Sequence, residues 1–393
     1  MATRSPISLL NALLLLWLAG VALRLTILAV PPVIPLIHLD LHLSKTQVGI
    51  LSGIPMVLFA GAAIAGSLLV TRFGAVRALI AGLVLCAIGG ALRGAGTDLW
   101  MLYAMTVVTA FGVAVMQPSL PPLVRTWAPQ RIGFATAVYT NGLIIGEILP
   151  AALTIPLVLP MLNQSWQWTF VFWSVPVAVI AAIILWLAPP TPAAAITPAA
   201  RKWMPDFRSP LIWRIGLLLG SVNASYFALN GFLPDYLTHT GRPDLINAAL
   251  TALNVGQLPA SFLLLASADR MVRTVWSYLV CGIVCLLCVL AIMLGGNWVV
   301  AGAAGWGCFG AAVLVLVLAL PPLISPPEDV HRVSAGMFTI SYSCAVIVPI
   351  ISGALWDLTG WTLSPLLPIV ACMLVVIGLA PTIVLRDKSP AKA

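Results

Sequence analysis

The sequence predicts an all-α integral membrane protein with twelve transmembrane helices in two six-helix, pseudo-symmetric halves. Composition is the first observation behind this class. Of the 393 residues, 61% are hydrophobic and only 8% are charged, whereas soluble domains carry about a quarter charged residues. The mean hydropathy of +1.08 is typical of a chain that crosses a membrane many times. The second observation is a series of twelve apolar runs, each long enough for the roughly 20 helical residues that a bilayer core requires.

The apolar runs follow one another with short breaks. Several contain Gly or Pro, which membrane helices tolerate when neighbouring groups satisfy the freed backbone. The first run comes after a short tail without a small-residue cleavage site, so we expect it to remain as the first helix. The twelve predicted runs are residues 9–37, 47–70, 75–93, 99–124, 132–160, 167–188, 210–234, 245–266, 275–295, 298–324, 333–354 and 363–385.

Positive charge is unevenly distributed along this pattern. With twelve helices both chain ends lie on one side of the membrane, and most of the Lys and Arg residues fall on that side. The opposite side receives only Lys45, Arg93 and Arg242, and we expect Arg93, at a helix end, to extend to the interface. The positive-inside rule therefore predicts cytoplasmic termini. This topology accounts for the net charge of +8, and we expect no nucleic-acid partner.

A hydrophilic segment divides the chain. Residues 189–209 are rich in Pro and Ala and then basic, which is typical of a linker. The segment separates an N-terminal half, 1–188, from a C-terminal half, 210–393. The halves repeat one feature, because "GSLLVTRFGAVR" (66–77) follows the second run and "LLLASADRMVR" (263–273) follows the eighth.

The two repeated turns resemble the signature of the major facilitator superfamily, Gly-x-Leu-Ala-Asp-Arg-x-Gly-Arg. The first turn keeps Arg72 and Gly74 but has Thr71 in place of the aspartate, and the second keeps Asp269 and Arg270 without the glycine. Longer segments resemble the cyanate / 2-nitroimidazole transporter family of this superfamily. They are "LHLSKTQVGILSGIPMVLFAGAAIAG" (41–66), "MQPSLPPLVRTWAPQRIGFATAVYTNG" (116–142), "GFLPDYL" (231–237) and "TALNVGQLPAS" (251–261).

The resemblance implies a secondary active transporter in the bacterial inner (plasma) membrane that works by alternating access. It implies a small anionic or planar polar solute: a cyanate-like anion, a small organic acid or a nitroimidazole-like compound. The solute site would lie near mid-membrane, between the halves. Gating residues, which would hold the cytoplasmic helix ends together in the outward-open state, are Arg72, Gly74, Arg77, Asp269 and Arg270. Simple anchoring by positive charge is the alternative for the arginines.

Two charged residues fall inside the predicted membrane core, Arg24 in the first run and Glu147 in the fifth. Each lies about fifteen residues past the start of its run, or roughly 22 Å along a helix, so both have a similar depth. A charge at this depth is costly and usually faces a partner or a wet cavity. The resemblance makes the first and fifth helices near neighbours, so a contact between Arg24 and Glu147 is feasible.

Two interpretations of these charges stay open. Arg24 and Glu147 form a structural ion pair, because buried charges require mutual compensation. Alternatively, Arg24 faces the cavity and its planar guanidinium binds the solute, while Glu147 anchors Arg24 or carries a coupling proton. A solute anion that takes Arg24 away would leave Glu147 easier to protonate, which is a route to proton–anion symport.

Amide and phenol side chains within other runs supply donors and acceptors without a charge. Some share a helix face, such as Asn223 with Tyr226 and Asn254 with Gln257. Hydrogen bonding between helices is the alternative role for each. With the two charged residues, the predicted binding set is Arg24, Glu147, Tyr139, Asn141, Asn223, Tyr226, Asn230, Asn254, Gln257 and Tyr342.

Other signals are weaker. His38, Asp40 and His42 have a spacing that can hold a metal, but they fall in an expected outer loop, and we predict a solvated mouth. The seven cysteines lie in apolar runs as small core residues. We therefore expect no metal and no cofactor. The chain has no GxxxxGK[ST] loop for ATP, so coupling would come from an ion gradient, with protons the possible coupling ion.

Rival functions remain. A broad multidrug or toxic-compound exporter would favour an acidic cavity for cationic drugs, which Arg24 disfavours. A membrane sensor or enzyme would need a soluble domain or a polar catalytic cluster. We expect a monomeric transporter, not an enzyme, whose partners are a small-molecule solute and the lipid bilayer.

Overall fold

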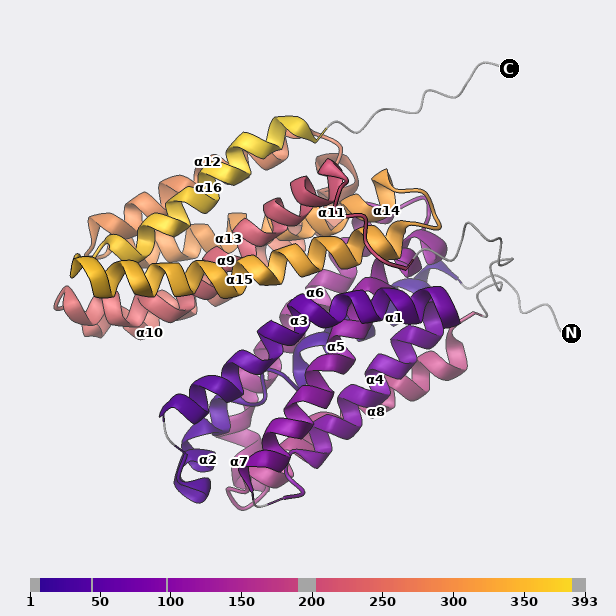
Figure 1. Cartoon of the computed structure of the whole chain (residues 1–393), viewed down its shortest axis with the longest axis horizontal. Coiled ribbons are helices and arrows are strands. Elements are labelled where there is room, and N and C mark those ends of the chain that lie inside the picture. Colours follow the sequence, from indigo (N-terminus) through magenta and orange to yellow (C-terminus); the bar gives the residue numbers. More distant parts are fainter. Residues whose placement is uncertain (1–7, 44, 97, 190–202, 384–393) are drawn as a thin grey trace, which may run out of the picture.

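The computed structural model describes residues 8–43, 45–96, 98–189 and 203–383, and within these ranges every regular element is a helix (Figure 1). Residues 190–202 of the predicted linker lie outside the described residues. The elements that precede the linker are α1 (Leu9–Leu25), η1 (Pro31–Val33), α2 (Ile34–Leu41), α3 (Lys45–Phe73), α4 (Ala75–Leu92), α5 (Leu99–Trp127), α6 (Ile132–Leu153), the π-helical turn η2 (Thr154–Val158), α7 (Leu159–Met161) and α8 (Trp166–Leu187).

The elements that follow the linker are again all helical. They are α9 (Pro210–His239), η4 (Pro243–Leu245), α10 (Ile246–Val255), α11 (Gln257–Met271), α12 (Val275–Leu294), α13 (Trp298–Leu318), α14 (Leu320–Ile324), α15 (Val330–Thr359), η5 (Ser364–Leu366), α16 (Leu367–Leu379) and η6 (Ala380–Thr382).

Eleven helical stretches of the described chain are long and apolar enough to cross a membrane. The apolar helix α1, with 17 residues, completes the twelve. The all-α class of the prediction is therefore confirmed. Because the spans alternate in direction, Leu9, Gly74 and Ile132 fall at one end of the bundle, here named the Leu9 end. The opposite end, which holds α2, is named the α2 end (Figure 1).

The first predicted run, 9–37, is not one helix. α1 ends at Leu25, and a turn and the short helix η1 lead into α2. Pro31 and Pro32 account for the break, because proline lacks the N–H that would continue the helical ladder. The expectation of an outer loop after the first run is also wrong. The segment to Leu41 is α2, and Asp40 accepts a hydrogen bond from Trp166 Nε1 at 2.9 Å.

Small residues bring α1 and α6 into backbone contact. A Cβ added at Gly20 would lie 2.0 Å from the Tyr139 carbonyl oxygen, and one at Gly146 would lie 2.3 Å from the Val21 carbonyl oxygen. Such contacts leave no room for any side chain at these positions. The close packing fixes the register of the two helices, and with it the position of Arg24 beside Glu147.

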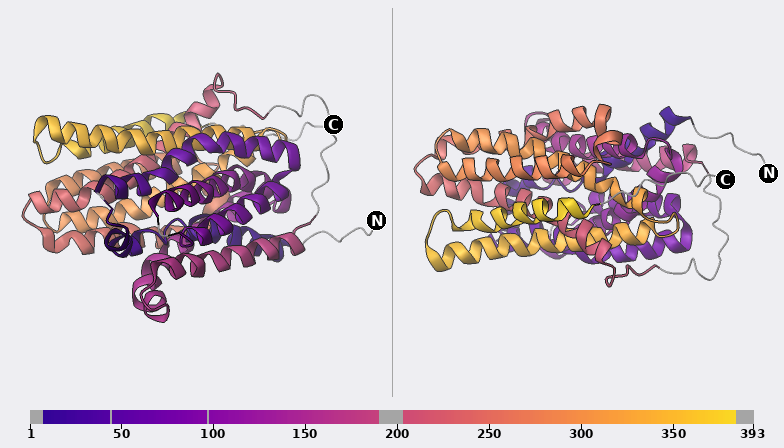
Figure 2. Two further views of the ribbon diagram at one scale, coloured as in Figure 1. Left: turned by 60° about the horizontal axis from the view of Figure 1, so that its bottom comes forward. Right: turned by 90° about the horizontal axis from the view of Figure 1, so that it is seen from above.

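The two halves meet mainly along two helix pairs. α3 packs against α15, and α6 packs against α11. In Figure 1 the halves lie against each other at the Leu9 end and diverge toward the α2 end, where α2 and α7 are far from α10. Figure 2 shows from two further sides that the long helices of both halves run along a common direction. The contact between the halves thus closes one end of the bundle.

Candidate functional site

Arg24 and Glu147 lie side by side between α1 and α6. Arg24 Nε is 3.3 Å from Glu147 Oε1, and the two side chains are 9% and 16% exposed. Arg24 Nε has no hydrogen-bond partner in the described part of the chain, so the pair is in contact without a well-aligned hydrogen bond. A buried ion pair in this state has not used all its bonding capacity. The arrangement leaves donor capacity on Arg24 for a further acceptor.

Tyr342 links this pair to the other half of the protein. Its hydroxyl accepts from Arg24 Nη2 at 3.3 Å and from Gln117 Nε2 at 2.7 Å. Phe59 covers the same group from α3, with its ring 5.9 Å from the Arg24 guanidinium carbon and 5.0 Å from the Tyr342 ring. Groups from α3, α6 and α15 therefore surround the Arg24 guanidinium of α1, and Gln117 of α5 joins them through Tyr342.

A small cavity of about 50 Å³ lies at this convergence, with space for a few water-sized groups. We name it the central cavity. Seven of the ten predicted binding residues line it, together with the apolar side chains of both halves. The seven are Arg24, Tyr139, Glu147, Asn223, Tyr226, Gln257 and Tyr342. Gln117 and Phe338, which the sequence did not single out, are further polar and aromatic members of this wall, and the Trp306 ring joins them.

A second cavity of about 440 Å³ lies toward the α2 end and is named the α2-side cavity. It shares Arg24, Glu147, Tyr226, Phe227 and Gln257 with the central cavity. Of the predicted set, Asn230 and Asn254 line only this second cavity. Arg24 and Glu147 thus stand at the boundary between two spaces along the axis of the protein.

Polar residues of the C-terminal half form a network beside this boundary. The Tyr226 hydroxyl donates to Asn254 Oδ1 at 2.6 Å, and Asn254 Nδ2 donates to Asn230 Oδ1 at 3.0 Å. Asn223 Nδ2 donates to Ser341 Oγ at 2.8 Å. Asn254 Nδ2 also donates to the Leu250 carbonyl oxygen, and Asn230 Nδ2 to the Tyr226 carbonyl oxygen. The amides therefore hold the wall of the cavities in shape.

Asn141 is the predicted binding residue that lines neither cavity. Its Oδ1 accepts from Trp17 Nε1 at 2.9 Å, and its Nδ2 donates to Ser261 Oγ at 3.0 Å. The second of these bonds joins α6 to α11 across the two halves. The structure therefore places Asn141 in the contact between the halves.

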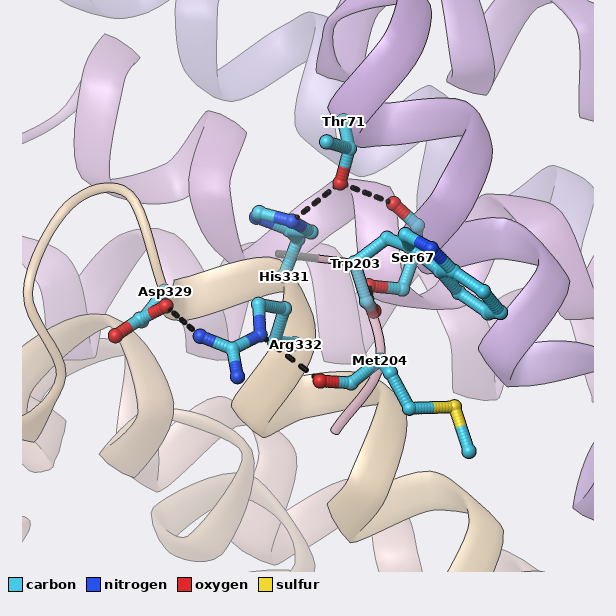
Figure 3. A network of polar contacts seen from close by, with 7 residues as sticks. All are labelled: Ser67, Thr71, Trp203, Met204, Asp329, His331 and Arg332. Atoms are coloured by element: carbon cyan, nitrogen blue, oxygen red, sulfur yellow. Dashed lines mark hydrogen bonds and ion pairs between the residues drawn. The ribbon is translucent and has the colours of Figure 1, made fainter. Parts of the chain in front are cut away.

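The Leu9 end is closed by polar contacts around the two signature turns. Thr71, which replaces the usual aspartate, lies 2.8 Å from His331 Nε2 and donates to the Ser67 carbonyl oxygen at 2.9 Å (Figure 3). Since the Thr71 hydroxyl proton is used on Ser67, His331 Nε2 is the donor in this contact. Ser67 Oγ also donates to the Trp203 carbonyl oxygen, in the segment before α9.

The second turn makes the pseudo-symmetric contact. Asp269 Oδ1 accepts from the backbone N–H of Phe134 at 3.0 Å, in the first turn of α6. A Cβ added at Gly133 would lie 2.8 Å from Asp269 Cα, so the approach is close. A carboxylate suits a helix N-terminus, where backbone N–H groups are free and the dipole is positive. Asp269 of one half thereby caps a helix of the other.

The remaining predicted gating residues take other positions. Gly74 is the residue directly before α4 and has φ +85°, a conformation that favours glycine. Among the described residues, Arg72, Arg77 and Arg270 form none of the hydrogen bonds or ion pairs between the halves, and all three are exposed. His331 does form such a bond, and Ser67 bonds to the segment before α9. Neither was predicted, because a single His or Ser carries no distinctive pattern.

Arg93 contradicts the expectation that it extends to the interface. Its side chain is buried, with 1% of the residue exposed. Nη2 donates to the Thr26 carbonyl oxygen at 2.9 Å, two residues after Arg24. Thr26 follows the last residue of α1, so its carbonyl is one of those a helix end leaves unpaired. The broken first helix is what gives Arg93 a buried partner.

Comparisons with known proteins agree with this architecture. The family model of the Major Facilitator Superfamily matches residues 16–242 and 222–393. The chain is 26% identical over 386 residues to the cyanate transport protein CynX of Escherichia coli (strain K12), across 94% of this chain and 97% of that protein. It is 25% identical over 376 residues to the 2-nitroimidazole transporter of the same organism, across 93% of each chain.

Solved structures share the fold. The crystal structure of FucP in the outward conformation matches with a TM-score of 0.74 at 14% identity, over 96% of this chain and 99% of FucP. The proton:xylose symporter XylE matches with a TM-score of 0.78 at 12% identity, over 95% and 94% of the two chains. The resemblance noted in the sequence is confirmed over nearly the whole length, and the chain belongs to the Major Facilitator Superfamily.

Proposed function

We propose that the protein carries a small anionic or planar polar solute across the membrane, with Arg24 as the main binding group. The observation that carries this proposal is the position of Arg24. A buried guanidinium contacts Glu147 in its own half and Tyr342 in the other, at the boundary of two cavities. A solute that binds this group would therefore change one contact within a half and one contact between the halves.

The chemistry of the site favours a small anion or a flat polar molecule. Arg24 offers a planar fork of donors, and Gln117 and Tyr342 add neutral hydrogen-bonding groups beside it. Tyr226 and Trp306, whose rings are 6.5 Å apart and nearly parallel, supply a flat apolar wall. The relatives named for cyanate and 2-nitroimidazole transport support the same class of solute.

Glu147 would couple transport to protons. While Glu147 faces Arg24, its negative charge is compensated. An anion that binds Arg24 removes that compensation, and a carboxylate in a poorly solvated cavity then gains by taking up a proton. The anion and the proton would cross together as a neutral load, which is proton–anion symport.

The conformational cycle follows from the contacts between the halves. The Leu9 end is held by Thr71–His331 and Asp269–Phe134, while the halves diverge at the α2 end (Figure 1). We assign the Leu9 end to the cytoplasm, because most basic residues fall there. The structure then corresponds to the outward-facing state of a bacterial inner-membrane transporter. Opening of the Leu9-end contacts would release the solute inward.

Uptake into reconstituted vesicles tests this proposal. Purified protein is given radiolabelled cyanate or 2-nitroimidazole, with and without an imposed pH gradient. Arg24→Gln should abolish uptake of the true solute, and Arg242→Gln is the matched control because Arg242 is exposed and paired with Asp244. Equal uptake by Arg24→Gln and wild type, with both proteins folded, would show that the role of Arg24 is purely structural.

A further inference from the structure

Arg93 is a second buried cation that the transport site does not use. Only 1% of the residue is exposed, although it lies at the end of α4. Burial of a guanidinium costs several kcal/mol unless its charge and its N–H groups are compensated. The groups around Arg93 therefore decide whether its burial is compensated.

The protein supplies only part of that compensation. Nη2 donates to the Thr26 carbonyl oxygen, and the Phe170 ring lies 5.0 Å from the guanidinium carbon. Nε and Nη1 are buried without a hydrogen-bond partner, and within the described chain no carboxylate lies in ion-pair distance of Arg93. Two donors and a full positive charge are left over, whereas buried polar groups are nearly always paired.

Arg93 also belongs to the wall of the α2-side cavity, as do Arg24 and Glu147 of the transport site. The charged residues of that cavity wall are Arg24, Arg93 and Glu147. Their formal charges, two positive and one negative, leave one positive charge in a space whose other lining side chains are neutral and mostly apolar. A net charge in a cavity of low dielectric attracts a counter-ion strongly. The cavity therefore has the sign of charge that a single anion requires, and one residue of its wall, Arg93, has buried donors without a partner.

Capping of α1 explains only one of the donors. The Thr26 carbonyl at the end of α1 is satisfied by Nη2 alone, and a neutral amide would satisfy it equally well. A cation near a helix C-terminus adds at most about 1–2 kcal/mol, which is less than the cost of burying a guanidinium. The charge on Arg93 is thus unexplained by the contact that holds it.

We propose that Arg93 forms a second anion-binding site in the α2-side cavity, where a small monoanion loads before it passes to Arg24. Nε and Nη1 of Arg93 bind the anion, and Nη2 keeps its bond to Thr26. Thr26, which holds Arg93, is two residues from Arg24, and both arginines line the same cavity, so the anion would pass between them within one space. The inference rests on the proposed function for the class of solute.

Thiocyanate binding to purified protein in lipid nanodiscs tests the second site. Calorimetric titrations compare wild type, Arg24→Gln, Arg93→Gln and the double variant. Gln at position 93 removes the charge and keeps a neutral amide donor on a shorter side chain, and melting temperatures check that each variant is folded. We expect Arg24→Gln to retain binding at Arg93, Arg93→Gln to retain binding at Arg24, and the double variant to bind none.

The four titrations separate this inference from the proposed function. Binding that Arg24→Gln abolishes and Arg93→Gln leaves unchanged overturns the second site and supports the first. Binding that Arg93→Gln abolishes and Arg24→Gln leaves unchanged supports the second site and contradicts the proposed role of Arg24. If neither single variant nor the double variant loses binding, both the second site and the proposed role of Arg24 are overturned.

Sided transport gives an independent readout. Vesicles are sorted by orientation, and KM is measured from each face. Arg93→Gln should raise KM about tenfold from the α2 face and leave KM from the Leu9 face unchanged. Arg93→Lys, which keeps the charge, should restore most of the affinity, while Arg242→Gln is the control for surface charge. An equal change from both faces would show that Arg93 acts only through the structure of α1.

Discussion

Arg24 and Tyr342 are 318 residues apart in the chain, yet Arg24 Nη2 donates to the Tyr342 hydroxyl at 3.3 Å across the two halves of the protein. Arg24 also contacts Glu147 within its own half. The guanidinium is therefore shared between a contact inside one half and a contact between halves. Any group that competes for Arg24 changes both contacts at once, which is how solute binding can be linked to rearrangement of the halves.

Tyr342→Phe should weaken solute binding. The hydroxyl accepts from Arg24 and Gln117, and its loss leaves two buried donors without an acceptor. Arg24 and Gln117 are then no longer oriented for the solute, and at about 1 kcal/mol for each hydrogen bond we expect KM to rise about five- to thirtyfold, with the free energy of unfolding lower by about 1–2 kcal/mol. Uptake kinetics measure this effect. Tyr278→Phe is the matched control, since the Tyr278 hydroxyl donates only to backbone carbonyls away from the cavities; a similar KM in both variants would contradict the assignment.

Glu147→Gln should separate exchange from accumulation. The amide keeps the size of the side chain but cannot carry a proton. We expect exchange of labelled solute across the membrane to continue, while a pH gradient no longer drives accumulation. Both quantities come from the same vesicles with and without the gradient. Accumulation at the wild-type level would show that Glu147 is not the coupling group, and a variant that fails to fold would favour the structural ion pair.

Gly142→Ala should separate α1 from α6. A Cβ at Gly142 would lie 2.3 Å from the Trp17 carbonyl oxygen, and backbone at this distance must move. Overpacking of this kind lowers the free energy of unfolding by about 1–3 kcal/mol, and transport should fall because Arg24 shifts relative to Glu147. Gly53→Ala is the control, because nothing lies within 4 Å of a Cβ there. Unfolding in detergent and uptake should both distinguish the two variants; equal behaviour would contradict the close packing.

Asp269→Ala should loosen the closed Leu9 end. The change removes the acceptor for the Phe134 N–H, and a capping interaction of about 1 kcal/mol corresponds to a several-fold shift in the population of the two states. Spin labels on exposed positions of α6 and α11 should show a larger share of long distances at the Leu9 end. Arg77→Gln, an exposed change outside the contact, should leave the distances as in wild type. No shift for Asp269→Ala would exclude it from the gate.

The helices and their number could be predicted from the sequence, because a long apolar run crosses a bilayer as a helix. The break after Leu25 was harder to predict, since run 9–37 is mostly apolar and only Pro31 and Pro32 signal that the helix ends before them. Once that break exists, the burial of Arg93 against Thr26 follows. A residue at a helix end therefore took a buried position that hydropathy alone assigns to the interface.

Charges in the core were easier to find than neutral partners. Arg24 and Glu147 stand out because charged residues are rare in apolar runs. The number of residues from the start of each run placed the two side chains at a similar depth in the membrane. Gln117 and the Thr71–His331 contact had no comparable signal. Their roles depend on contacts between residues more than two hundred positions apart, which only the packing of the two halves brings together.

Crystals soaked with selenocyanate test the central claim most directly, because anomalous scattering locates the selenium without a model of the solute. The account predicts a selenium peak in the central cavity, with the anion in hydrogen-bond contact with the Arg24 guanidinium and Glu147 displaced from it. An anion bound elsewhere at saturating concentration, with Arg24 and Glu147 still in contact, would contradict the claim that Arg24 receives the solute.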